Sequence, residues 1–140
     1  MDTIEMAGHL IRRLHQQSTQ VFQARMQAAG HDLTPVQFAA LDAIARQPRV
    51  DQASLAATIG FDRATIGGVI ERLEHKGLVQ RVVSAHDRRA RELSLTPAGR
   101  RLLAAIRPRV EALQADILAP LSRAERATFL ALAQKALEIG

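Results

Sequence analysis

Apolar side chains recur every three or four residues along most of the chain, the spacing that places them on one face of an α-helix. The first such run extends over about residues 2–29 and contains Ile4, Ile11, Leu14, Val21 and Phe22. Gly30 follows it, and glycine is the residue most often found just beyond a helix. The pattern predicts one long amphipathic helix over residues 2–29.

Three shorter apolar runs follow, each preceded by a residue that can cap a helix. Thr34 precedes Pro35, which suits the first helical position, and Gln37 is placed to complete a capping box. Asp51 and Asp62 precede the other two runs, and aspartate is a favoured N-cap. We expect helices over residues 34–47, 51–60 and 62–77, the last two joined by the tight connection Gly60–Phe61.

The apolar spacing changes from helical to short and alternating between residues 78 and 95. Segments 78–83 and 91–95 are separated by the polar loop 84–90, which predicts a β-hairpin. Helical spacing resumes at Thr96 and continues past Pro108, which we expect to kink the helix without ending it. Pro120 should end it, and a capping box formed by Ser122 and Glu125 predicts a last helix reaching residue 139.

The order of these elements predicts the fold class. Two short helices with a tight connection, followed by a hairpin, form a winged helix-turn-helix. The apolar content of 47% is carried by aliphatic residues, with four Phe and no Trp or Tyr, which also favours helices. We therefore predict a mostly α fold (α+β minor) in a single domain, residues 1–140. Its parts are a DNA-binding core at 34–95 with the wing at 79–95, and N- and C-terminal dimerisation helices at 1–30 and 96–140.

The charge distribution indicates the class of partner. The net charge is +5, and residues 63–109 hold eleven Lys or Arg against four acidic residues. A basic excess inside a helix-turn-helix and its wing predicts binding to double-stranded DNA. The other interpretation, a solvated basic face on a helical protein-interaction adaptor, stays open at this point.

The start of the second helix of the helix-turn-helix carries the candidate base contacts. Arg63 can bind guanine or a phosphate, and Thr65 a phosphate or a thymine methyl group. Gly67 and Gly68 each cost about 1 kcal/mol in a helix, which indicates close approach of another group. We expect DNA to approach Gly68, and either DNA or a neighbouring helix to approach Gly67. The predicted DNA-binding residues are Ser54, Arg63, Ala64, Thr65, Gly67, Gly68, Arg72, Arg88 and Arg89.

The wing loop adds basic side chains that suit the narrow minor groove. Arg88 and Arg89 are the expected contacts, and Asp87 is expected to position an arginine through a carboxylate–guanidinium pair. The alternative is an exposed basic loop without a partner.

Three segments resemble the MarR family of bacterial regulators. Residues 87–99 match its wing pattern D-x-R-x-x-x-L-x-L-T-x-x-G, and residues 73–79 and 33–41 are similar to its segments after the recognition helix and at the second-helix entry. The resemblance implies a homodimer with intertwined terminal helices that binds a pseudo-palindromic operator and often responds to phenolic or aromatic acids. It assigns the wing arginine to Arg89 and the positioning acid to Asp87. Many members have a basic residue where this chain has Gly68.

The first helix and the last two helices carry more apolar surface than one small domain can cover. This gives an independent reason to expect a homodimer. Between the dimerisation helices and the DNA-binding core, a cleft could bind a small aromatic carboxylate effector. The residues expected there are His9, Arg13, His15 and Phe38. The alternative is that these side chains are solvated or pair with acids across the dimer.

Other kinds of site lack the residues they need. The chain has no cysteine, which excludes disulfides, thiolate metal sites and peroxide sensing through a thiol. No two histidines are four residues apart, the spacing that would place two metal ligands on one helix face. Glu71 and His75 do have this spacing, and we expect them to form a salt-bridged surface pair. We find no catalytic motif, and expect neither enzyme activity nor a metal or cofactor. No leader or membrane-spanning run is present, so a cytoplasmic, nucleoid-associated protein is expected.

The predicted function is therefore a sequence-specific DNA-binding transcriptional regulator, a repressor released by a small aromatic or phenolic acid. Two alternatives remain at this stage. One is an effector-independent DNA-binding or architectural protein, and the other is the protein-interaction adaptor.

Overall fold

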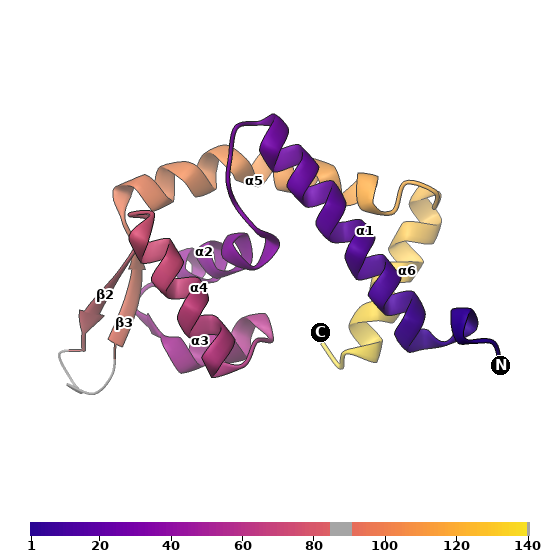
Figure 1. Cartoon of the computed structure of the whole chain (residues 1–140), viewed down its shortest axis with the longest axis horizontal. Coiled ribbons are helices and arrows are strands. Elements are labelled where there is room, and N and C mark those ends of the chain that lie inside the picture. Colours follow the sequence, from indigo (N-terminus) through magenta and orange to yellow (C-terminus); the bar gives the residue numbers. More distant parts are fainter. Residues whose placement is uncertain (85–90, 140) are drawn as a thin grey trace.

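The computed structural model describes residues 1–84 and 91–139. Within these residues the chain is mostly helical with a small antiparallel sheet, as predicted (Figure 1). The elements are η1 (Thr3–Glu5), α1 (Ala7–Ala28), α2 (Pro35–Arg46), β1 (Val50–Asp51), α3 (Gln52–Ile59), α4 (Arg63–His75), β2 (Val79–Val83), β3 (Arg91–Leu95), α5 (Pro97–Ile117) and α6 (Arg123–Ala136).

Side-chain caps fix most of the helix starts where the sequence predicts them. At α2, Thr34 Oγ1 accepts from the Gln37 backbone N–H at 3.2 Å, and Gln37 Oε1 accepts from the Thr34 N–H at 3.2 Å. Ser122 and Glu125 form the same reciprocal pair at α6. Gly60 ends α3 with φ 75°, a left-handed conformation that glycine adopts without strain.

Both ends of the chain differ from the prediction. Asp2 caps only the 3-10 turn η1, and extended backbone at Met6 delays the start of α1 to Ala7. The last helix ends at Ala136 and does not reach residue 139, because Glu138 has φ 58°. In contrast, α5 continues through Pro108 as one helix and ends at Ile117, three residues before Pro120.

The sheet contains a strand that the sequence did not predict. Strand β1 pairs with β3 through Val50 and Leu93, giving the antiparallel order β1-β3-β2. Two residues are too few for an alternating pattern to show, so β1 is visible only from its pairing. It attaches the start of α3 to the hairpin.

The core lies between α2, α3, α4 and the sheet, and extends under α5. Its fully buried side chains come from each of these elements, and they include Leu41, Ile44, Leu55, Ile70, Leu93 and Ile106. From α1, Phe22 and Met26 near the C-terminal end reach this core.

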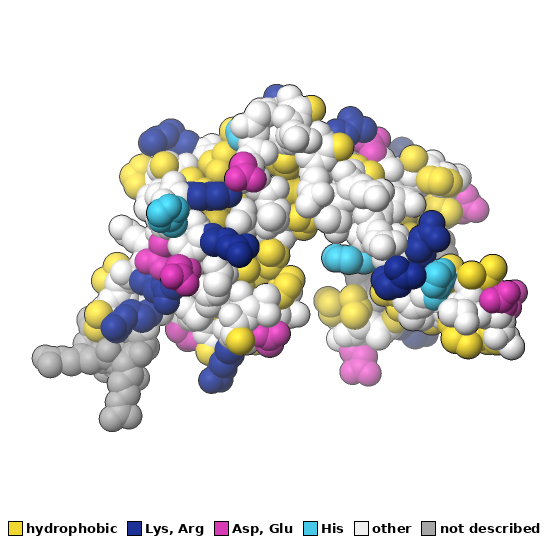
Figure 2. Space-filling model, in the orientation of Figure 1, with side chains coloured by type: hydrophobic (Ala, Val, Ile, Leu, Met, Phe, Trp, Pro, Cys, Tyr) yellow, Lys and Arg dark blue, Asp and Glu magenta, His cyan; other side chains and the backbone are white. Residues whose placement is uncertain are grey.

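The chain has the form of an arch. Helix α5 spans the top, with the α2–α4 unit and hairpin on one side and the N-terminal part of α1 with α6 on the other (Figure 1). A hollow separates the two sides in the space-filling view (Figure 2). No described residue of α6 is buried, and Leu130 and Leu132 are 53% and 59% exposed. One side of the arch is therefore packed around a core, whereas the other leaves apolar side chains uncovered.

Candidate nucleic-acid interface

Helices α3 and α4 begin with the same capping arrangement. Asp62 Oδ1 accepts from the Thr65 N–H at 2.7 Å, and the Thr65 hydroxyl donates to Asp62 Oδ2 at 3.0 Å. Asp51 and Ser54 repeat these two bonds at 2.7 and 2.9 Å. The backbone N–H bond, followed by the hydroxyl bond, lowers the pKa of each aspartate below its ordinary value. Both helix starts are thus fixed by ionised caps.

These caps limit what Ser54 and Thr65 can offer to DNA. A hydroxyl has one hydrogen to donate, and in both residues it is directed to the capping carboxylate. A phosphate accepts hydrogen bonds and needs that same hydrogen. Of the two roles expected for Thr65, contact of its methyl group with a thymine methyl therefore fits the geometry better than a phosphate bond.

The exposed side chains of α4 include two unpaired cations. Among the described residues, neither Arg63 nor Arg72 has an ion-pair partner, and both are exposed. Asp62 and Thr65 hold the helix start from which Arg63 extends. Unpaired guanidinium groups at the start and along the side of a helix are suited to bases and phosphates.

The two adjacent glycines of α4 have different surroundings. A Cβ atom at Gly68 would meet nothing within 4 Å, so its face of the helix is open. A Cβ atom at Gly67 would lie 3.3 Å from Nε2 of Gln52, the first residue of α3. A neighbouring helix therefore packs against Gly67, whereas space beside Gly68 remains for another molecule.

The wing is braced where it joins the rest of the unit. Arg81 on β2 pairs with Glu74 of α4 at 2.6 Å, and Arg49 pairs with Glu92 of β3 at 2.7 Å. These contacts fix the hairpin against α4 and β1. The predicted wing residues Asp87, Arg88 and Arg89 lie outside the described residues.

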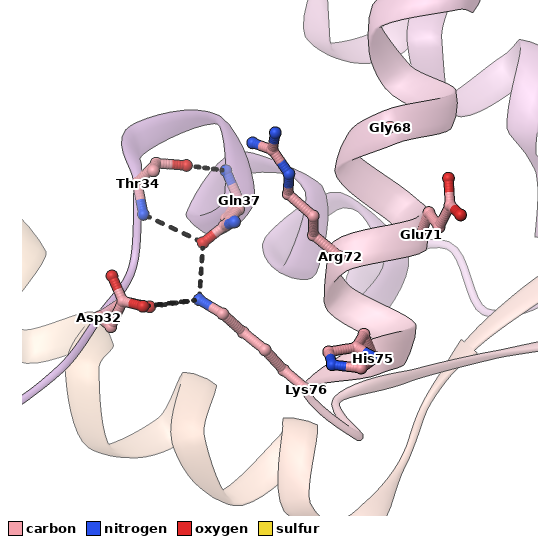
Figure 3. Close-up of a pocket in the computed structure, with 8 residues that line it drawn as sticks. All are labelled: Asp32, Thr34, Gln37, Gly68, Glu71, Arg72, His75 and Lys76. Atoms are coloured by element: carbon pink, nitrogen blue, oxygen red, sulfur yellow. Dashed lines mark hydrogen bonds and ion pairs between the residues drawn. The ribbon is translucent and has the colours of Figure 1, made fainter.

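A cleft of about 590 Å³ lies beside α4, between that helix and the segment that leads into α2 (Figure 3). Lys76 crosses it, donating to the Asp32 backbone carbonyl at 2.5 Å and to Gln37 Oε1 at 3.3 Å. Arg72 extends into the cleft from the side of α4 (Figure 3). Asp32 and Glu71 balance the two basic residues, so the cleft has no strong excess of either charge.

The expected surface pair between Glu71 and His75 is wrong. Both side chains are exposed, and within the described part of the chain they form no ion pair with each other. Spacing of four residues places two side chains on one helix face, but between exposed side chains the attraction is too weak to fix their conformation.

The residues expected in a ligand cleft are three from α1, which lie on two faces of that helix, and Phe38 from α2. His9 and Arg13 are four residues apart and share a face, whereas Arg13 and His15 are separated by about 200° around the helix axis. His15 lines a groove of about 610 Å³ between α1, α5 and α6. Phe38 packs against Phe22, with ring centroids 6.3 Å apart. A single chain therefore does not gather the four into one cavity.

Among the described residues, no helix combines the length and the apolar character needed to cross a membrane.

Comparison with known proteins identifies what this chain is similar to. The family model described as "MarR family" matches residues 31–90, the segment from the entry of α2 to the wing. The HTH-type transcriptional repressor NicR of Pseudomonas putida is 35% identical over 137 residues, covering 98% of this chain and 85% of NicR. The similarity thus includes the terminal helices as well as the helix-turn-helix.

Solved structures agree with this comparison over nearly the whole chain. The structure of BpsR from Bordetella bronchiseptica has a TM-score of 0.90 and 31% identity, covering 100% of this chain and 99% of that one. DNA binding by BpsR is regulated by 6-hydroxynicotinic acid. The transcriptional repressor CouR, bound to a 23-mer DNA duplex, has a TM-score of 0.81 and 28% identity, covering 95% of this chain and 93% of CouR.

Proposed function

The chain belongs to the MarR family of transcriptional regulators, and from this premise we propose that it binds operator DNA as a homodimer and represses transcription until an aromatic acid releases it. The observation that carries the proposal is the exposed start of α4, where Arg63 has no ion-pair partner among the described residues and Gly68 leaves the helix surface open. CouR, which has a similar fold, is bound to duplex DNA.

The proposed DNA contacts come from the start of α4 and from the wing. Arg63, Ala64 and Thr65 enter the major groove with the start of α4, and Gly68 permits close approach. Arg72, on the side of α4 that lines the cleft, binds the phosphate backbone. Ser54, whose hydroxyl hydrogen is donated to Asp51, adds van der Waals contact at the edge of this surface and no phosphate bond. Arg88 and Arg89, positioned by Asp87, extend from the wing into the minor groove.

Uncovered apolar side chains in and next to α1 and α6 support the homodimer. Ile4, Ile11, Leu132 and Leu137 are each about 60% exposed or more, and they lie on the side of the arch that lacks a core. Water contact with so many large apolar groups is unfavourable, and a second copy would bury them. A two-fold dimer also presents two α4 helices to successive turns of DNA.

The proposed effector is a small aromatic carboxylic acid. BpsR, whose DNA binding is regulated by 6-hydroxynicotinic acid, has a TM-score of 0.90 to this chain. His9 and Arg13 share one face of α1, and together they offer hydrogen bonds and charge to a carboxylate. Because His15 lies on the other face of α1 and Phe38 on α2 packs against Phe22, a site that uses all four residues needs a second copy to complete it.

The proposed function is tested by selecting DNA fragments that the purified protein retains, then measuring affinity for them by fluorescence anisotropy. We expect a pseudo-palindromic site whose log Kd depends on log salt with a slope of about five or more, because several phosphates are neutralised in each half-site. Arg63→Ala and Arg89→Ala should each weaken binding by about 1–3 kcal/mol without unfolding the protein. No enrichment from the library would contradict the proposal and favour the protein-interaction adaptor.

The effector is tested on the same operator with 6-hydroxynicotinic acid and a panel of aromatic carboxylates. We expect at least one acid to weaken operator binding, and Arg13→Ala to abolish that response while operator affinity without the acid stays unchanged. Arg123→Ala is the matched control, since Arg123 is an exposed arginine on α6 and, among the described residues, has no contact with His9 or Arg13. If no acid acts on the wild-type protein, the effector-independent regulator is the better description.

A further inference from the structure

We propose that Gln52, at the start of α3, is a specificity-determining residue that binds the edge of an adenine in the operator. This inference rests on the proposed DNA-binding function and adds a base contact from outside the recognition helix. Neither the helix-turn-helix pattern nor the family resemblance assigned a role to Gln52.

The Gln52 side chain lies against α4 beside Gly67. Its Nε2 atom lies 3.3 Å from the point where a Cβ atom of Gly67 would be. A real Cβ atom at position 67 would make a tighter contact than most Cβ atoms do, so the glycine of α4 leaves room for the carboxamide of α3. The carboxamide consequently lies directly beside the backbone of α4 at Gly67.

The carboxamide lies beside the face of α4 that carries Arg63. Gly67 follows Arg63 by four residues, so the two positions are neighbours on one side of the helix. Arg63 is the exposed arginine at the helix start. Gln52 therefore extends the polar surface that begins at Arg63 by about one helical turn.

The Gln52 side chain has unused hydrogen-bonding capacity. In the described part of the chain, the Gln52 carboxamide has no hydrogen-bond partner, although it is partly buried. Other glutamines of this unit are engaged: Gln37 accepts from Lys76 at 3.3 Å, and Gln80 donates to Ser94 at 3.2 Å. Gln52 is thus held against α4 with both its donor and its acceptor available.

The chemistry of a free glutamine at this place favours adenine. A carboxamide presents one acceptor and one donor group side by side, which match the N6 amino group and N7 of adenine in the major groove. Guanine offers two acceptors on that edge, and a carboxamide cannot satisfy both. The expected partner is therefore one A·T pair in each half-site.

The experiment compares the sequences that wild type, Gln52→Ala, Gln52→Glu and Gly67→Ala each select from a random DNA library. Wild type should select an A·T pair that Gln52→Ala no longer distinguishes, a loss of roughly 5- to 150-fold in preference at that position only. Gln52→Glu should select C·G there, because a carboxylate accepts from the cytosine N4 amino group. Gly67→Ala should weaken the same preference by moving the carboxamide outward.

Gln47→Ala is the matched control, because Gln47 is an exposed glutamine at the other end of the unit, beyond α2. It should select the wild-type sequence. Thermal unfolding of each variant confirms that the proteins are folded. A purely structural role of Gln52 could not produce the change in selected base pair from A·T to C·G that is expected for Gln52→Glu.

Three results would overturn the inference. Identical selected sequences for all variants would show that Gln52 binds no base. An equal loss of affinity for every sequence on changing Gln52 would assign it to the phosphate backbone. Failure of the wild-type protein to enrich any sequence would contradict the proposed function itself, and the role of Gln52 with it.

Discussion

Gly99 is a residue at which a single methyl group determines whether the wing and α5 fit together. It is buried in the first turn of α5, and a Cβ atom there would clash with the backbone carbonyl of Leu78 and lie 3.3 Å from its Cα. Backbone cannot move aside as a flexible side chain can. Leu78 also accepts a hydrogen bond from the Thr96 N–H at 3.0 Å, which holds it in place.

We expect Gly99→Ala to lower the free energy of unfolding by about 3 kcal/mol, since overpacking against fixed backbone strains both elements. Urea denaturation measures the change. Gly68→Ala is the matched control: it is also a helical glycine but has open space around it, so its unfolding free energy should rise by up to about 1 kcal/mol. Equal stability of the two variants would contradict the clash.

At the scale of the element, the start of α4 depends on an ionised cap. The pKa of Asp62 is lowered, first by the Thr65 backbone N–H and then by its hydroxyl. A carboxylate whose pKa is lower in the folded state stabilises that state at all pH values above its unfolded pKa of about 4. This stabilisation is lost as the pH falls through the folded pKa.

We therefore expect Asp62→Asn to unfold at a temperature that differs from wild type by a constant amount above about pH 5. Asparagine also caps helices well but does not titrate in this range. Below about pH 4, the wild-type protein should lose stability relative to the variant. Thermal melts from pH 3 to 7 test this, and a difference that stays constant throughout would show that the cap does not contribute in this way.

One ion pair connects α5 with the DNA-binding core. Asp42 of α2 pairs with Arg107 of α5 and also accepts from Arg46 Nε at 3.0 Å. The Asp42 and Arg107 side chains are only 22% and 33% exposed, so solvent screens them less than a surface pair. The contact fixes the position of α2 along the helix that spans the arch.

Arg107→Met should lower the free energy of unfolding by about 1–2 kcal/mol, between the values typical of exposed and of buried pairs. The double-mutant cycle with Asp42→Asn should show a coupling energy of similar size. The pair between Arg25 and Asp116, which are 56% and 45% exposed, is the control and should contribute less than about 1 kcal/mol. Additive effects at Asp42 and Arg107 would argue against the connection.

Comparison of sequence and structure shows which elements local chemistry determines. Helix starts were predictable because Thr34, Asp62 and Ser122 act on backbone groups within three residues of themselves. Strand β1 was not predictable, since its two residues are defined by pairing with β3, more than 40 positions away. The limits of α1 and α6 were also missed, because extended backbone at Met6 and left-handed backbone at Glu138 interrupt an apolar pattern that continues.

The residues of the candidate site were also predictable only where local sequence determines their position. Arg63, Thr65 and Gly68 were identified from their place at the start of a helix, which the sequence shows directly. Gln52 was not, because its proximity to Gly67 arises from the packing of α3 on α4. The one signal in the sequence was Gly67, a glycine that lowers helix stability and so indicates close approach of another group. It did not show that this group is the Gln52 side chain.

At the scale of the whole molecule, the two sides of the arch have different requirements for stability. The core of α2–α4, the sheet and α5 is complete within one chain, whereas no described residue of α6 is buried. Dimerisation should therefore be separable from folding of the DNA-binding core. Operator binding should depend on both, because one α4 helix alone contacts only half of a pseudo-palindromic site.

Leu132→Glu tests this separation, since Leu132 is 59% exposed on α6 and lines a shallow apolar depression with Leu121 and Phe129. A buried carboxylate opposes association, so we expect the dimer to dissociate at micromolar concentration in analytical ultracentrifugation and operator affinity to fall at least tenfold. Helical content by circular dichroism should stay close to that of wild type. Gln134→Glu adds the same charge to an exposed polar position of α6 and should remain dimeric. If Leu132→Glu remained dimeric and bound the operator normally, this face of α6 would have no part in the interface.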